Sequence, residues 1–174
     1  MKSLLGLRKR INKDALADRL KELSQRGAWT LQAYLLEKKS RWLKNTGLTS
    51  VTLDADSTVS MVYGNQQRAA KGFNEKKKVA KSYHPLLVFV SEMKLLYHSW
   101  FRTGTAYTSN GIEDFLKEVK TSLLDTIKKI FFRAYSGFFK DPLLELLEVY
   151  GWDYLIKVKL KNLHELLRSR HGIL

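Results

Sequence analysis

Two short stretches of the chain contain side chains that could take part in phosphoryl transfer: residues 53–58 (LDADST) and residues 132–138 (FRAYSGF). Each stretch lies at the end of an expected β-strand. Because side chains alternate along a strand, Asp54 and Asp56 share one face while the apolar residues between them take the buried face. Carboxylates on neighbouring strands can hold the two metal ions of a phosphoryl-transfer site, so the first stretch is a candidate for that chemistry.

The second stretch contains a tyrosine, Tyr135, and no carboxylate. A phenol with an ordinary pKa of about 10 is neutral at pH 7 and is a poor ligand for Mg²⁺. The two stretches together therefore indicate a nuclease-like site that lacks one of its metal ligands.

Composition limits the kind of molecule that can carry this site. The 174 residues suffice for one domain with a substantial core, and 44% hydrophobic and 11% aromatic residues favour a globular chain over a disordered basic tail. Thirty-one Lys and Arg against seventeen Asp and Glu give a formal charge of +14, which suits a polyanionic partner: DNA, RNA or an anionic membrane surface.

Cysteine and export signals point to the compartment. The chain has no cysteine, so it has neither disulfides nor thiolate chemistry, which fits a cytoplasmic protein. The apolar stretch within residues 1–10 is short and broken by charge, and the longest apolar run, residues 86–90, cannot span a bilayer. We expect a cytoplasmic location without membrane insertion.

The elements that must position the site begin with two amphipathic helices, expected over residues 13–25 and 29–43 and separated by a break at Gly27. Two helices joined at a glycine also fit a helix-turn-helix, although packing of both helices on a sheet is the commoner meaning of the pattern. We expect an N-terminal helical segment over residues 1–47 and the main domain over residues 48–174.

After these helices, the pattern predicts a three-strand meander and then alternating helices and strands. Ser109 and Asn110 offer an N-cap for the first of these helices, Pro142 starts the second, and Gly151 ends it. This order is typical of a mixed-sheet α/β domain. The expected strands cover residues 49–55, 86–93, 95–101, 130–134 and 154–158, and a final helix runs through Arg168.

Four peptide words occur in order along the chain: LDADSTVSMVYGNQ (53–66), AKGFNEKKK (70–78), KSYHPLLVF (81–89) and RAYSGF (133–138). They resemble a bacterial insertion-sequence transposase of the DDE class, in the branch with an Asp-x-Asp-Ser-Thr word and an Arg-Ala-Asp-Ser-Gly-Phe word. The resemblance covers residues 49–163 and implies a ribonuclease H-like α/β fold, in which the first and fourth strands lie side by side.

The resemblance also implies a set of catalytic acids. Asp56 matches the first aspartate, and Tyr135 occupies the position of the second. The third acid of the family is a glutamate from a helix beyond an inserted segment, and the chain stops at Leu174 before any such segment. Intact relatives would use Mg²⁺ or Mn²⁺; we expect neither to bind tightly here.

Other acids are alternative ligands in this chain. Asp54 could support Asp56 or be solvated, and Glu165 could complete the site or lie on a surface helix. Asp141 and Asp153 are weaker candidates.

Basic residues supply the expected DNA contacts. A glycine-containing loop carries six of them, and such a loop could bind phosphates or be merely solvated. The six are Arg68, Lys71, Lys76, Lys77, Lys78 and Lys81. Arg102 begins a polar stretch that resembles an Arg-Pro-Gly segment of the family, and this stretch could line the same DNA-binding groove as the basic loop. Tyr97, Trp100 and Trp152 could stack on bases, but their apolar patterns favour the core.

Three functions remain open from the sequence. The leading expectation is a catalytically inactive, transposase-derived DNA-binding protein. The second is a regulator that pairs with an intact transposase or masks its DNA ends. The partner of the chain could be such a transposase or a second copy of itself. The third is a residual metal-dependent nuclease whose site is rebuilt around Asp56 with Asp54 or Glu165.

Overall fold

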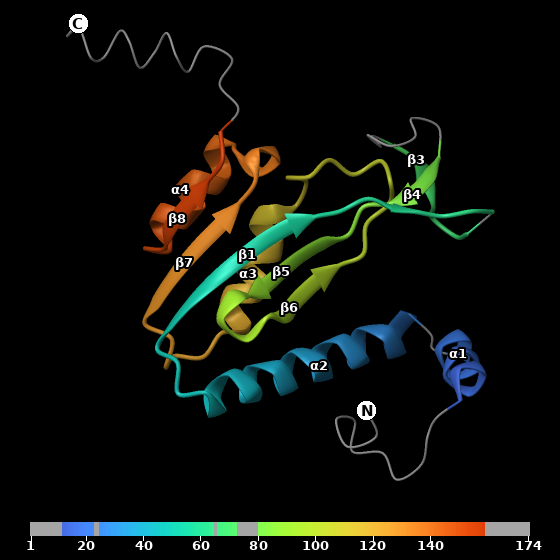
Figure 1. The fold of residues 1–174 in the computed structure, drawn as a ribbon, viewed down its shortest axis with the longest axis horizontal. Helices are drawn as coiled ribbons and strands as arrows, with labels where there is room; N and C mark the ends of the chain where they lie inside the picture. The colour runs from blue at the N-terminus through green and yellow to red at the C-terminus, as the bar shows by residue number, and fades with distance from the viewer. Residues whose placement is uncertain (1–11, 23–24, 65, 73–79, 159–174) are drawn as a thin grey trace, which may run out of the picture.

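The computed structural model describes residues 12–22, 25–64, 66–72 and 80–158 (Figure 1). Two N-terminal helices precede a mixed α/β domain, as the sequence predicts. The helices are α1 (Lys13–Glu22), α2 (Gln25–Asn45), α3 (Ile112–Ser122) and α4 (Asp141–Val149). The strands are β1 (Ser50–Ser57), β2 (Ser60–Met61), β3 (Ala70–Lys71), β4 (Lys81–Tyr83), β5 (Leu86–Val90), β6 (Leu95–Trp100), β7 (Lys129–Ala134) and β8 (Asp153–Ile156).

Five of the strands form the main sheet in the order β6-β5-β1-β7-β8. Strands β6, β5 and β1 pair antiparallel as the expected meander, whereas β7 and β8 run parallel to β1 and follow crossover helices. The first and fourth strands of this sheet, β1 and β7, are therefore neighbours. The ribonuclease H-like arrangement implied by the resemblance is confirmed.

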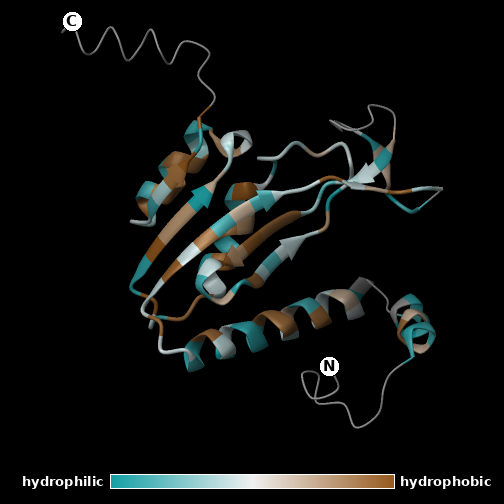
Figure 2. Cartoon of the chain, viewed as in Figure 1, coloured by the Kyte–Doolittle hydropathy of each residue, from teal (hydrophilic) through white to brown (hydrophobic). Residues whose placement is uncertain are grey.

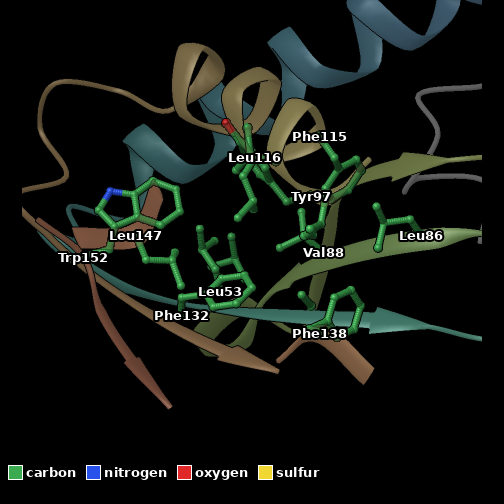
Figure 3. Packing of buried hydrophobic residues seen from close by; sticks show 14 of the residues in the cluster. Leu53, Leu86, Val88, Tyr97, Phe115, Leu116, Phe132, Phe138, Leu147 and Trp152 are labelled. Carbon is green, nitrogen blue, oxygen red and sulfur yellow. The ribbon is translucent and has the colours of Figure 1, made fainter. Parts of the chain in front are cut away.

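The core lies between one face of the sheet and the helices α3 and α4 (Figure 3). Leu53 on β1 and Phe132 on β7 point to this face together with Phe115 and Leu116 of α3, and all four are fully buried. Alternation along β1 explains the arrangement, because every second residue from Val51 to Ala55 is buried. The opposite face carries Asp54 and Asp56.

Helix α2 lies along the outer edge of β6. The side chains of Gln32 and Lys39 donate hydrogen bonds to the backbone carbonyls of Ser99 and Tyr97, at 3.1 Å each. An edge strand exposes unpaired backbone groups to which a strand of another chain could bind. In this protein, side chains of α2 bind two of the exposed carbonyls of β6. The expected break at Gly27 is wrong, because α2 begins at Gln25 and passes through this glycine. Hydrophobic and hydrophilic residues alternate along α2 (Figure 2).

The segment between β1 and β5 forms a small second sheet in the order β2-β4-β3, which we call the arm (residues 60–83, of which 65 and 73–79 are not described). It projects beyond one end of the main sheet (Figure 1). The sequence predicted only a loop here, since strands of two or three residues are too short to show periodicity. The arm packs closely on the loop after β6: a Cβ on Gly72 would lie 1.6 Å from the carbonyl oxygen of Gly104.

Several boundaries differ from expectation for local reasons. β5 ends at Val90 because a 3-10 helix, Ser91–Met93, follows it and closes with Lys94 in the left-handed region. Ser109 and Asn110 do not cap α3; its N-cap is Gly111, with φ of 73° and no side-chain cap hydrogen bond. Pro142 does lie in the first turn of α4.

The final helix expected through Arg168 lies outside the described residues. Among the helices of the described part, none is long and apolar enough to cross a bilayer.

Candidate active site

The register of β1 and β7 brings the two candidate positions together. Asp54 pairs with Arg133 and Ala55 with Ala134 across the parallel ladder, so Asp56 and Tyr135 follow at the same edge of the sheet. Both line a cleft of about 710 Å³ on the open face. The other residues lining this cleft are Asp54, Ala55, Phe89, Arg133, Ala134, Leu155 and Lys157.

Asp54 is held by a bidentate ion pair. Arg133 donates from Nε to Oδ1 at 2.6 Å and from Nη2 to Oδ2 at 2.8 Å, and Nη2 also donates to Ser91 Oγ at 3.1 Å. These bonds lower the pKa of the Asp54 carboxyl, and the pair raises the pKa of Arg133. Because both carboxylate oxygens accept from Arg133, Asp54 has little capacity left to ligate a metal ion.

Asp56 is the carboxylate of the cleft that no basic side chain engages among the described contacts. Its Oδ1 accepts from the backbone N–H of Ser57 at 2.7 Å. Ser57 Oγ in turn accepts from Arg102 Nη2 at 2.8 Å. The bond between Arg102 and Ser57 thus joins the loop after β6 to the end of β1, next to Asp56.

Tyr135 is exposed to 64% at the point where β7 ends. It is the extended N-cap residue of the 3-10 helix Ser136–Phe138, whose Phe138 is buried in the core. The turn packs tightly against the loop before α3, since a Cβ on Gly137 would lie 2.9 Å from Thr108 Cγ2. The anchored turn therefore fixes where the Tyr135 backbone lies while its phenol faces the cleft.

The side chains that line this cleft do not provide the metal ligands of a two-metal site. Such a site needs carboxylates shared between two ions, and the cleft offers Asp56 next to a neutral phenol and an Asp54 already bonded by arginine. Within the described ranges no group of three His, Cys, Asp or Glu side chains is placed to hold a metal. Asp141 and Asp153 are exposed at the starts of α4 and β8 and do not line the cleft. Glu165 lies outside the described residues.

Arg102 directs its guanidinium into the protein. Nε donates to the carbonyl of His84 at 2.9 Å and Nη1 to the carbonyl of Asn110 at 2.6 Å, while further bonds reach Tyr107 and Thr108. Burial lowers the pKa of Arg102. With its donors used in this way, Arg102 connects β4, β1 and the polar loop before α3.

The remaining basic candidates lie on the arm. Arg68 and Lys71 are exposed, and Lys81 on β4 is half-buried. The structure describes only part of the predicted basic loop, because Lys76, Lys77 and Lys78 lie outside the described residues. Tyr63, exposed to 80%, lies on the same arm.

The three aromatic candidates pack inside the domain. Tyr97 is fully buried and Trp152 is 7% exposed, as their apolar patterns predict. Trp100 is half-buried edge-on against Phe115, and its Nε1 donates to Glu118 at 2.9 Å.

Sequence reasoning missed three features of the cleft: the Asp54–Arg133 pair, Lys157 and the apolar wall formed by Phe89 and Leu155. A signal for the ion pair was present, because Arg133 precedes Tyr135 by two residues just as Asp54 precedes Asp56. No comparable signal marks Lys157, which follows the last strand and reaches the cleft only through the order of the sheet.

Two transposases are among the solved structures to which this chain is similar. A piggyBac transposase synaptic complex with hairpin DNA aligns with a TM-score of 0.50 and 15% identity over 92% of this chain and 40% of that chain. A Mos1 transposase paired-end complex with the left transposon end gives a TM-score of 0.44 and 9% identity over 98% of this chain and 64% of that one. A Mos1 mariner paired-end complex with Mn gives a TM-score of 0.43 and 12% identity over 98% and 59%.

The chain thus spans less than two thirds of the length of these transposase chains. Comparison with curated protein sequences gave no match. The family model described as "Transposase DDE domain group 1" matches residues 10–171, which is nearly the whole chain. With the fold and the paired strands on which the family words lie, this match places the chain in the DDE transposase family.

Proposed function

We propose that this chain is a DNA-binding protein derived from a DDE transposase of the bacterial insertion-sequence type, and that it does not cleave DNA. The observation that carries the proposal is the residue beside Asp56: the register of β1 and β7 brings the phenol of Tyr135, rather than a carboxylate, next to Asp56 in the cleft. In the family words that the chain resembles, an aspartate would stand in place of Tyr135. The chain keeps the sheet that positions the site but not the ligand set.

The loss of activity follows from how two metal ions act in phosphoryl transfer. One ion activates the attacking oxygen, the other stabilises the leaving oxygen, and a shared carboxylate fixes their separation. A neutral phenol cannot replace that carboxylate, and Arg133 already binds Asp54 through both oxygens. Asp56 alone would hold at most a weakly bound ion.

DNA binding needs no metal ligands, and several observations support it. The formal charge of +14 favours a polyanion, because each phosphate contact releases condensed counterions. The exposed Arg68 and Lys71 lie on the arm that projects beyond the sheet. The similar piggyBac structure is a synaptic complex of that protein with hairpin DNA.

The proposal is tested by measuring binding and cleavage on the same preparation. We expect labelled duplex DNA to be bound with an affinity that falls steeply with salt, and supercoiled plasmid to remain uncut in millimolar Mg²⁺ or Mn²⁺. Asp56→Ala is the matched control for contaminating nuclease. Metal-dependent nicking that Asp56→Ala abolishes would favour the residual nuclease instead, and absence of DNA binding at low salt would overturn the proposal.

Exposed aromatic side chains on α2 favour a second candidate, a regulator that pairs with an intact transposase. Trp29, Tyr34 and Trp42 are exposed to 63%, 51% and 57% on this helix, more aromatic surface than a solvated helix needs. Co-expression with a full-length relative tests this candidate. Co-purification lost in Trp42→Glu, but kept in the matched control Arg41→Glu, would support pairing through the exposed aromatic side chains of α2.

A further inference from the structure

The cleft beside Asp56 has an exposed aromatic and apolar wall. Tyr135 and Leu155, from the ends of neighbouring parallel strands, are exposed to 64% and 62%. Phe89 lines the same cleft from β5. An exposed aromatic ring next to apolar side chains can receive the flat face of a base, and every base has such a face.

The charges of the cleft are balanced without a metal ion. Among the described residues that line it, four carry formal charge, and two of these, Asp54 and Arg133, neutralise each other in their bidentate pair. Asp56 and Lys157 remain, one negative and one positive. A cleft with two unpaired carboxylates would repel a phosphate until cations bound, whereas this cleft places an exposed ammonium group beside a single carboxylate.

From this wall and this charge balance we propose that the cleft binds one nucleotide of single-stranded DNA without a metal ion. Tyr135 stacks on the base, and Lys157 contacts the adjoining phosphate. The inference rests on the proposed DNA binding and deepens it, because it replaces metal-mediated contact with a contact made by side chains of this chain. The tyrosine that removes a metal ligand thus supplies a binding surface.

Single-stranded DNA is the form that this geometry selects. A base inside a duplex is stacked on both faces and cannot lie against Tyr135, whereas an unpaired base can. Loss of one stacked aromatic weakens such complexes by roughly tenfold or more. Removing one phosphate-contacting lysine weakens binding less and lowers its dependence on salt.

Fluorescence anisotropy with a labelled oligothymidylate tests the inference, first in EDTA and then in millimolar Mn²⁺. We expect the wild-type affinity to be the same in both. Tyr135→Ala should lower it about tenfold, while Tyr135→Phe, which keeps the ring, should retain most of it. Lys157→Gln should lower both the affinity and the slope of its logarithm against salt concentration.

Matched controls separate the cleft from the general charge of the protein. Lys129→Gln removes an exposed lysine at the start of β7, the end of that strand remote from Tyr135, and Tyr34→Ala removes a half-exposed aromatic on α2. We expect both to bind the oligonucleotide more tightly than the cleft variants. A thermal melt of each variant verifies that it folds.

Two results overturn the inference. The first is that Tyr135→Ala and Lys157→Gln bind the oligonucleotide as tightly as their control variants do. The second is that the wild type no longer binds the oligonucleotide in EDTA. If duplex DNA still binds in either case, the proposed function stands and only the cleft is excluded. If neither duplex nor single-stranded DNA binds, the proposed function fails as well.

Discussion

Asp54 and Arg133 face each other across the parallel ladder of β1 and β7 and are joined by two hydrogen bonds of 2.6 and 2.8 Å. Each lies two residues before a position of the candidate site, Asp56 on β1 and Tyr135 on β7. Because side chains two apart share a face, the pair lies on the face that carries the site and just below it. A one-residue slip between the strands would break the pair, so the pair favours the register that brings Asp56 beside Tyr135.

The first prediction concerns the pH dependence of stability. Arg133 lowers the pKa of Asp54 in the folded protein relative to its ordinary value of 3.8, so the carboxylate stays ionised to lower pH when folded than when unfolded. The stabilisation is therefore fully present above the unfolded pKa and is lost as pH falls through the folded pKa. We expect Asp54→Asn to melt about 1–3 °C below the wild type at pH 7, since the pair is partly exposed.

Urea unfolding of both proteins between pH 3 and pH 7 checks this prediction. The difference between wild type and Asp54→Asn should shrink as the pH falls below about 4. Asp153→Asn, at an exposed position outside the cleft, is the matched control. A difference that stays constant down to pH 3 would show that the ionised pair does not cause the loss.

The second prediction concerns metal binding. Tyr135→Asp should restore a second carboxylate beside Asp56 and create a site for Mn²⁺, whereas the melting temperature of the wild type should not respond to millimolar Mn²⁺. A ligand that binds only the folded state stabilises it by about 1.4 kcal/mol when present at tenfold its Kd. Thermal melts with and without Mn²⁺ measure the effect.

The size-matched control for this experiment is Tyr135→Asn, which removes the ring without adding charge. We expect no Mn²⁺ response from Tyr135→Asn or from the double variant Asp56→Ala/Tyr135→Asp. An equal response from Tyr135→Asn would mean that the ion binds elsewhere. No response from Tyr135→Asp would mean that the side chains at 56 and 135 do not converge.

The strands of the main sheet could be predicted from the sequence because they carry strong local signals. Val51, Leu53 and Ala55 alternate with polar residues along β1. Phe132 lies in the short apolar run of residues 130–132, which is typical of a buried strand. The adjacency of β1 and β7 came from the resemblance rather than from periodicity, which identifies strands but does not pair them.

The parts that were mispredicted depend on long-range contacts. Gly27 continues a helix because α2 is stabilised by contacts with β6 and α3 further along, which outweigh the low helix propensity of one glycine. Gly111, rather than Ser109 or Asn110, caps α3 because the loop before that helix is held by Arg102 through the carbonyls of Tyr107 and Asn110. The arm was missed because its strands are two or three residues long and are held by pairing with one another and by the close contact of Gly72 with Gly104.

The third prediction concerns how the arm is attached. A Cβ on Gly104 would lie 2.4 Å from the carbonyl oxygen of Ala70 and 2.5 Å from that of Ser82, far inside normal contact, and backbone atoms cannot move aside cheaply. We expect Gly104→Ala to loosen the arm while the main sheet stays folded. Limited proteolysis should cut the variant faster within the arm. In the control Gly151→Ala the added Cβ has open space but the backbone, with φ of 64°, is strained. Because Gly151 follows α4 and not the arm, we expect this strain to leave arm cleavage unchanged.

Equal rates of arm cleavage in Gly104→Ala and the wild type would contradict this packing. If the main sheet unfolded as well, the far-UV circular dichroism signal would fall at the same time as cleavage of the arm increased. That result would show that the arm and the sheet unfold as one cooperative unit.

The last prediction separates two roles of Arg102, a DNA contact and an internal connection. Its guanidinium donates to the carbonyls of His84, Thr108 and Asn110 and to Ser57 Oγ, and an ammonium group cannot reproduce this planar set of donors. We expect Arg102→Lys to cost about 1–3 kcal/mol of unfolding free energy, because half-buried carbonyls lose their partners although the charge is kept. Hydrogen exchange should rise in residues 103–110, next to the end of β1. If Arg102 acts instead through phosphate contact, Arg102→Lys should retain both DNA affinity and stability, and Arg102→Gln should lose affinity without a change in exchange.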